Sequence, residues 1–139
     1  MMDKGLTRFI NAQAGSYQTA LSEIKNGRKR SHWMWFIFPQ IQGLGLSETA
    51  RFYAIQDLQE ANAYAQHPVL GPRLVEISTA LLGVKSNDAH AVMGSPDDLK
   101  LKSSMTLFGA LPRANPVFQA VLEKFFGGAQ DEKTLRIIR

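Results

Sequence analysis

The sequence is 139 residues long, the size of one domain, and with 45% hydrophobic and 20% charged residues it has an ordinary globular composition. It contains no cysteine, which excludes disulfides, thiolate nucleophiles, cysteine-type zinc sites and iron–sulfur clusters. Its net charge of +4 is mildly basic, so anionic partners are allowed but not demanded.

We find no repeat, low-complexity tract or linker that would divide the chain, so residues 1–139 are expected to form a single domain. Charged residues occupy the start of the chain, where a signal peptide would need an apolar stretch. The longest apolar run, residues 33–38, is far too short to cross a bilayer, which takes about 20 residues. These features predict a soluble cytoplasmic protein.

The first half of the chain has helical apolar spacing in two places. Leu6, Phe9 and Ile10 share one face, and residues 17–24 continue as a second helix that Gly27 ends. Residues 33–38 fit either a buried strand or a buried helical turn. Because no second segment alternates with period two, we predict a short helix that Ser31 caps and Pro39 ends.

The middle of the chain has clear helix boundaries. Ser47 is a predicted N-cap, Asp57 and Glu60 have capping-box spacing, and Pro68 ends the helix that follows. The clearest amphipathic stripe comes next, and it consists of Leu70, Leu74, Ile77 and Leu81. Arg73 lies beside this stripe, and we favour an ion pair with Glu76 over a role as a ligand clamp.

The last third predicts three more helices. Ser95 and Pro96 precede Asp97 and Asp98, which combines a cap, a first-turn proline and two acids at the positive end of a helix dipole. Asn115-Pro116 repeats this start signal, Gly127-Gly128 ends that helix, and Asp131 caps a final turn. The predicted fold class is all-α: a compact single-domain array of about seven to eight short helices.

Several blocks of the sequence resemble a small, mostly bacterial family of unknown function whose members are often labelled "calpastatin". The resemblance lies in SHWMWFIFPQ (residues 31–40), in HPVLGPRL (residues 67–74) and in DDLKLKSSMTLF (residues 97–108). It implies a compact helical fold and supplies no established activity. A true calpastatin is a long disordered inhibitor, whereas this chain has the composition of a packed domain, so the label does not indicate protease inhibition.

Residues 28–38 hold the densest binding chemistry in the chain. A basic run that includes Arg30 precedes His32, Trp33 and Trp35. Guanidinium groups pair with phosphate, and an indole can stack on a base, so this segment is a candidate pocket for an anionic, ring-bearing ligand. The alternative is structural: the tryptophans anchor the core, the basic run is a solvated helix end, and His32 is a hydrogen-bonded structural group.

A second candidate row follows the acidic helix start. Lys100 and Ser103 share one side of the predicted helix, opposite the apolar stripe, and Ser104 adjoins them. This polar row could face a ligand. The alternatives are solvated surface, or serine hydroxyls that bond back to the preceding turn.

Other catalytic signatures are missing from the sequence. It has no nucleophile elbow, no Walker A lysine motif and no complete dinucleotide fingerprint. His32, His67 and His90 lack metal-ligand spacing, so we expect neither a metal nor a cofactor.

The leading hypothesis is that the chain binds an anionic, ring-bearing metabolite such as a nucleotide or an ADP-ribose derivative. Trp33 or Trp35 would stack on the ring, Arg30 and Lys100 would hold phosphate, and His32 would orient the ligand or transfer a proton. If the ligand is also processed, these residues permit general acid–base chemistry through His32 with Asp97 or Asp98.

The alternative hypothesis is a non-enzymatic interaction module that docks an acidic protein or a nucleic-acid backbone through its basic and aromatic segment. A pocket requires His32, Lys100 and Ser103 to meet around a concavity, whereas a docking surface leaves the cations splayed outward.

Overall fold

The computed structural model describes residues 5–139, which form ten helices and no β-strand. The all-α prediction is therefore confirmed, with slightly more helices than expected because several are single turns. The helices, in chain order, are α1 (Thr7–Ala14), α2 (Tyr17–Lys25), α3 (Met34–Ile37), α4 (Glu48–Phe52), α5 (Leu58–Gln66), α6 (Leu70–Leu82), α7 (Ala89–Met93), α8 (Asp97–Gly109), α9 (Pro116–Phe126) and α10 (Glu132–Ile138).

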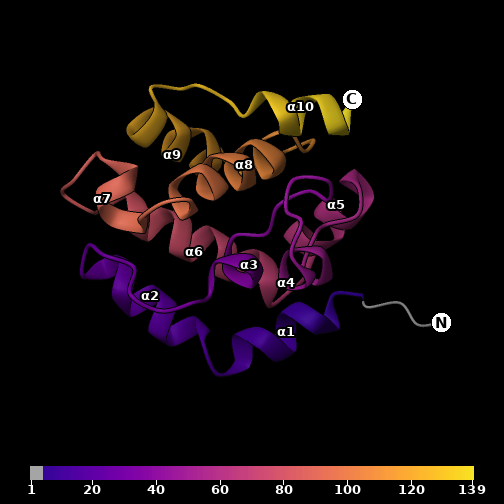
Figure 1. Ribbon diagram of the computed structural model, residues 1–139, viewed down its shortest axis with the longest axis horizontal. Coiled ribbons are helices and arrows are strands. Elements are labelled where there is room, and N and C mark those ends of the chain that lie inside the picture. Colours follow the sequence, from indigo (N-terminus) through magenta and orange to yellow (C-terminus); the bar gives the residue numbers. More distant parts are fainter. Residues whose placement is uncertain (1–4) are drawn as a thin grey trace.

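Two helices form the centre of the molecule. α6 packs against α2, α5 and α9, and α8 packs against α5, α7, α9 and α10. Figure 1 shows α1 and α2 along one edge, α8, α9 and α10 along the opposite edge, and α6 between them. The predicted stripe of α6 lies in the core. α8 is buried over the whole stretch from residue 103 to 108, so it is an interior helix with no solvated face there.

Many predicted helix boundaries are confirmed by side-chain caps. Ser47 accepts a hydrogen bond from the Ala50 backbone N–H at the start of α4, and Asp131 accepts one from Thr134 at the start of α10. Asn115 caps α9 with Pro116 in its first turn. Gly127 ends α9 with φ of 62°, a left-handed conformation that glycine adopts without strain.

Two predicted caps are wrong. α3 begins at Met34 with Trp33 in the cap position, because the Ser31 hydroxyl bonds to Glu23 instead. α8 begins at Asp97 with Pro96 in the cap position, and Ser95 makes no cap bond. Both helices are present but begin later than these caps predict, at Met34 and Asp97, because the residue expected to cap each one is engaged elsewhere or makes no cap bond.

A buried ion pair ties the N-terminal helix to the middle of the chain. Arg8 is 5% exposed and pairs with Glu60 of α5 across 3.1 Å. Its guanidinium also donates to the carbonyls of Phe52 and Ala54, at 2.8 and 2.7 Å. A buried charge is stable only when its hydrogen-bonding groups are satisfied, and these bonds meet that requirement. The predicted capping box is half right: Asp57 accepts from the Glu60 backbone N–H, whereas the Glu60 carboxylate serves Arg8 and the Gln56 N–H.

Among residues 5–139, none of the helices has the length and apolar character needed to cross a membrane.

Candidate functional site

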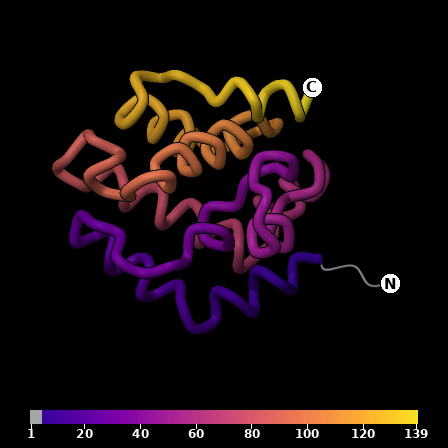
Figure 2. The backbone as a smooth tube through the Cα atoms, viewed as in Figure 1, coloured from indigo at the N-terminus to yellow at the C-terminus, as the bar shows by residue number. Residues whose placement is uncertain are grey.

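The segment that joins α2 to α3 is irregular rather than helical and bends at residues 31–32. Exposure alternates along it. Arg28, Arg30 and His32 are exposed, Lys29 and Ser31 between them are half-buried, and Trp33, which follows, is 1% exposed. Figure 2 traces this segment from the end of α2 past α7 to α3. One stretch of sequence therefore supplies an outward cationic row and an inward structural row.

The inward row is held by Glu23 of α2. Its carboxylate accepts hydrogen bonds from the Trp33 indole Nε1 at 2.9 Å and from the Ser31 hydroxyl at 2.5 Å. It also accepts from the backbone N–H groups of Arg30 and Ser31, at 2.7 and 3.0 Å. Burial alone would raise the pKa of the Glu23 carboxyl, but these four bonds favour the charged form more strongly and lower the pKa to about 2.

Sequence reasoning missed Glu23. The available signal was indirect: a buried tryptophan requires an acceptor for its indole N–H. No spacing rule connects a helical glutamate to a tryptophan ten residues later in an irregular segment.

A shared carboxylate joins the tryptophan-bearing segment to the start of α8. Asp97 lies 2.8 Å from the Lys29 ammonium and 3.6 Å from that of Lys100. The Lys29 ammonium lies 5.0 Å from the centre of a Trp33 ring, and that of Lys100 lies 5.3 Å from the centre of a Trp35 ring. Cations over aromatic faces are attracted by the ring quadrupole. The two regions that the binding hypothesis needs as neighbours are therefore adjacent.

The structure separates the other predicted site residues from this cluster. Ser103 is buried and its hydroxyl donates to the Leu99 carbonyl at 3.1 Å, the backward bond that the alternative interpretation described. The Ser104 hydroxyl is fully buried and has no hydrogen-bond partner among the described residues. His32 is exposed, and its side chain makes no hydrogen bond or ion pair within residues 5–139.

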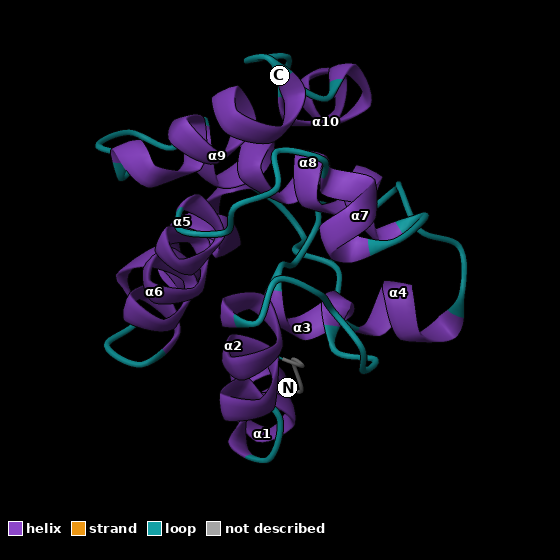
Figure 3. Ribbon diagram, turned by 90° about the vertical axis from the view of Figure 1, so that its left-hand side faces the viewer, coloured by secondary structure: helices purple, strands orange, loops and turns teal. Residues whose placement is uncertain are grey.

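A hollow of about 440 Å³ opens beside the cluster. It is lined by Arg28, by Lys29 and by residues 90–95, which comprise most of α7 and the start of the link from α7 to α8. The Lys29 backbone N–H donates to the Val92 carbonyl at 2.8 Å and fixes the two walls together. Figure 3 shows α7 lying against α8 at this edge of the molecule. The hollow is predominantly polar, and the exposed Arg28 can reach a ligand placed in it.

Arg73 is not paired with Glu76, contrary to expectation. Its guanidinium donates to the Gln13 side chain at 3.3 Å and lies over the Tyr17 ring. Glu76 instead accepts a hydrogen bond from the Tyr17 hydroxyl. Burial, and then this carboxylate, raise the pKa of the Tyr17 phenol. These contacts connect α1, α2 and α6 and leave Arg73 with a structural role. No group of residues within 5–139 could hold a metal ion.

The fold and the cluster define a small all-helical domain with one cationic, aromatic edge. The chain belongs to the DUF1810 family, described as proteins of unknown function, whose model matches residues 3–138. A crystal structure with the same fold is that of the conserved hypothetical protein Rv1873 from Mycobacterium tuberculosis. That protein is 48% identical, with a TM-score of 0.93, and the match covers 96% of this chain and 95% of the other. No curated protein matches the sequence.

Proposed function

We propose that the protein binds a small, phosphate-bearing metabolite that also carries a ring, of the nucleotide or ADP-ribose type. The observation that supports this proposal is the connection through Asp97. This carboxylate pairs with Lys29, which lines the hollow, and with Lys100, which lies over Trp35. A cationic hollow and a half-buried indole are therefore adjacent. One ligand could place its phosphate in the hollow and its ring on the indole.

In this proposal the candidate residues have different roles. Arg28 and Arg30 are exposed, and their planar guanidinium groups suit phosphate oxygens. Trp35 is the tryptophan that stacks on the ring, since Trp33 is enclosed and bonded to Glu23. Asp97 positions Lys29 and Lys100. His32 is the group that can move a proton to or from the ligand.

A thermal-shift experiment tests this proposal with ADP-ribose and AMP, each at about 1 mM, and with ribose as the uncharged comparison. A site of about 10 μM affinity adds ~2.7 kcal/mol of stability at that concentration, which raises the Tm by several degrees. We expect the shift to disappear in the double variant Arg28→Gln/Arg30→Gln. The matched control is Lys133→Gln/Arg136→Gln, which removes the same charge from exposed positions on α10.

The proposal fails if neither phosphate compound raises the Tm of the unmodified protein. It also fails if both double variants reduce the shift equally, because the effect would then report net charge rather than a site.

The outward row favours a second function. Arg28, Arg30 and His32 are all exposed within one short irregular segment, as expected of a surface that docks an acidic protein segment or a nucleic-acid backbone. Titration with a polyglutamate peptide and with single-stranded DNA, at several salt concentrations, tests this function. Docking predicts measurable binding of the polyanions that weakens steeply with salt, and a small response to AMP. A pocket predicts a clear response to AMP and little binding of the polyanions.

A further inference from the structure

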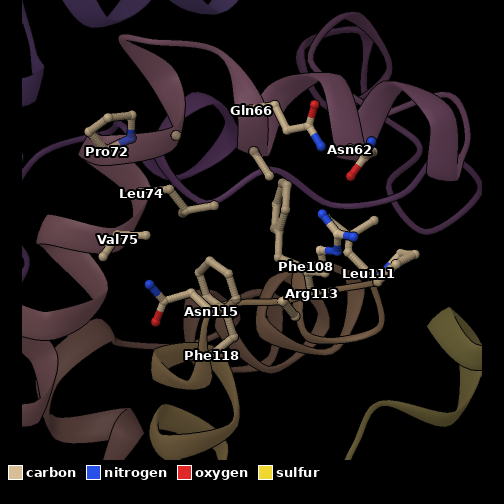
Figure 4. A pocket seen from close by; sticks show the side chains of 14 residues that line it. Asn62, Gln66, Pro72, Leu74, Val75, Phe108, Leu111, Arg113, Asn115 and Phe118 are labelled. Carbon is tan, nitrogen blue, oxygen red and sulfur yellow. The ribbon is translucent and has the colours of Figure 1, made fainter.

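A second hollow lies on a different side of the molecule, between α5, α6 and the loop that joins α8 to α9. It encloses about 370 Å³, within the size range of small-molecule sites. Its inner walls are apolar and include Leu74, Leu111 and Phe118. Figure 4 shows the amide side chains of Asn62 and Gln66 at the end of the hollow where Arg113 lies.

Among residues 5–139, Arg113 is the one charged residue that lines this hollow. Its side chain makes no hydrogen bond or ion pair with any residue from 5 to 139. By contrast, the guanidinium of Arg8, which lies in the core, is bound to Glu60 and to backbone carbonyls. A guanidinium beside an apolar cavity without a carboxylate in the lining leaves one positive charge for a ligand to match.

The backbone conformation that positions the Arg113 side chain is strained. Arg113 has φ of 61°, a left-handed conformation that side-chain-bearing residues rarely adopt. Pro112 and Pro116 flank it and restrict the loop further. Asn115 uses its side-chain oxygen to cap α9, so only its amide donors remain for the cavity. Strained residues of this kind recur in ligand sites because the surrounding structure fixes them in place.

We propose that this hollow binds a small amphipathic monocarboxylate. The apolar body of the ligand lies between α6 and α9, against Val75, Leu111 and Phe118. Its carboxylate pairs with the Arg113 guanidinium and accepts further hydrogen bonds from the amides of Asn62 and Gln66. One guanidinium matches the single charge of a carboxylate, whereas a phosphate dianion would keep part of its charge uncompensated at an apolar wall.

The test uses 3-phenylpropionate as the probe and 3-phenylpropionamide as its uncharged isostere. In ¹H–¹⁵N NMR titrations of the full chain, we expect shifts at the backbone amides of Val75, Leu111 and Phe118. For a ligand of this size, a Kd of about 1 mM is expected. The amide should bind the unmodified protein about tenfold more weakly than the acid does. Both ligands should bind Arg113→Asn with that weaker affinity, because the charge is gone. Asparagine is chosen because it tolerates a left-handed backbone.

Two further variants separate the cavity from the charge. Val75→Phe fills the hollow while it keeps Arg113, and it should abolish the shifts. Arg136→Gln removes an exposed arginine on α10 and should leave the Kd unchanged. Circular dichroism and the dispersion of the NMR spectra verify that each variant is folded.

The proposal is overturned if 10 mM 3-phenylpropionate leaves those three amides unshifted, or if the acid and the amide bind equally. It is also overturned if the shifts map to residues 28–35. Because the probe carries no phosphate and the hollow shares no residue with the cluster around Asp97, failure here leaves the nucleotide proposal standing, and the reverse also holds.

Discussion

Two irregular segments, residues 28–33 between α2 and α3 and residues 110–115 between α8 and α9, each bring a cationic side chain to the rim of a hollow. The first segment is held by carboxylates from outside it: Glu23 binds its backbone and its tryptophan, and Asp97 binds Lys29. The second is held by two prolines and a helix cap, and Arg113 has no acidic partner within residues 5–139. Within these two segments, Lys29 is paired with a carboxylate and serves the structure, whereas Arg28 and Arg113 line hollows without such a partner among residues 5–139.

The largest expected effect comes from removal of the Glu23 carboxylate. Glu23→Ala leaves the Trp33 indole N–H and two backbone N–H groups of the segment without their acceptor. Bonds to a charged acceptor and the unsatisfied donors left behind predict a loss of about 3 kcal/mol in the free energy of unfolding. Urea unfolding measures this loss. A change below about 1 kcal/mol would show that residues 28–33 are not anchored through this carboxylate.

Acid should remove part of the same stability. The folded-state pKa of Glu23, about 2, is lower than its unfolded value near 4.5, so the unfolded chain binds the proton more tightly. The contribution of Glu23 is therefore full above about pH 4.5 and is lost as the pH falls towards 2, with a size of about 2 kcal/mol after allowance for solvent screening. Urea midpoints at pH 7 and pH 3 measure it. The stability gap between the unmodified protein and Glu23→Gln should narrow at pH 3, and an unchanged gap would contradict the prediction.

A smaller effect is expected at the shared carboxylate of α8. Asp97→Asn removes the charge between Lys29 and Lys100, and Lys29 is the more enclosed of the two, with 8% of its side chain exposed. We expect the free energy of unfolding to fall by about 1–2 kcal/mol, which lies between the values for surface and buried ion pairs. Asp98→Asn is the matched control because its partner, His90, is largely exposed. Equal losses in the two variants, by thermal or urea unfolding, would remove the distinction between them.

The smallest effect, of opposite sign, is expected in the second segment. Arg113→Asn replaces a strained residue by one that tolerates the left-handed conformation, and no hydrogen bond or ion pair of the arginine side chain with residues 5–139 is lost. The free energy of unfolding should rise by about 0.5 kcal/mol. Destabilisation by this variant would mean that Arg113 supports the fold, and the contrast between the two segments would disappear.

The parts of the fold that could be predicted are those governed by local rules. The stripe of α6 and the caps at Ser47, Asn115 and Asp131 follow from spacing and side-chain chemistry alone. α8 was harder because its hydroxyl residues resemble a solvated face. Ser103 and Thr106 satisfy their hydroxyls on carbonyls four residues earlier, which permits the burial of these two side chains, whereas the buried Ser104 hydroxyl has no partner among the described residues.

The site was predictable as a neighbourhood but not in its contacts. The sequence brought Trp35 and Lys100 together as candidates, and the fold does place them in contact. The roles of Glu23 and Arg113 depend on long-range packing and on backbone conformation. A glutamate within a helix and an arginine after a proline carry no local mark of either role.

The contact between α5 and α6 depends on a missing methyl group. A Cβ atom at Gly71 would lie 2.2 Å from the Ala65 carbonyl oxygen, so the helical hairpin closes this tightly only with glycine there. Both residues also border the apolar hollow. Substitution of Gly71 by alanine would push the two helices apart and enlarge the hollow. The size of the hollow is therefore controlled by a backbone position that need not contact a bound ligand.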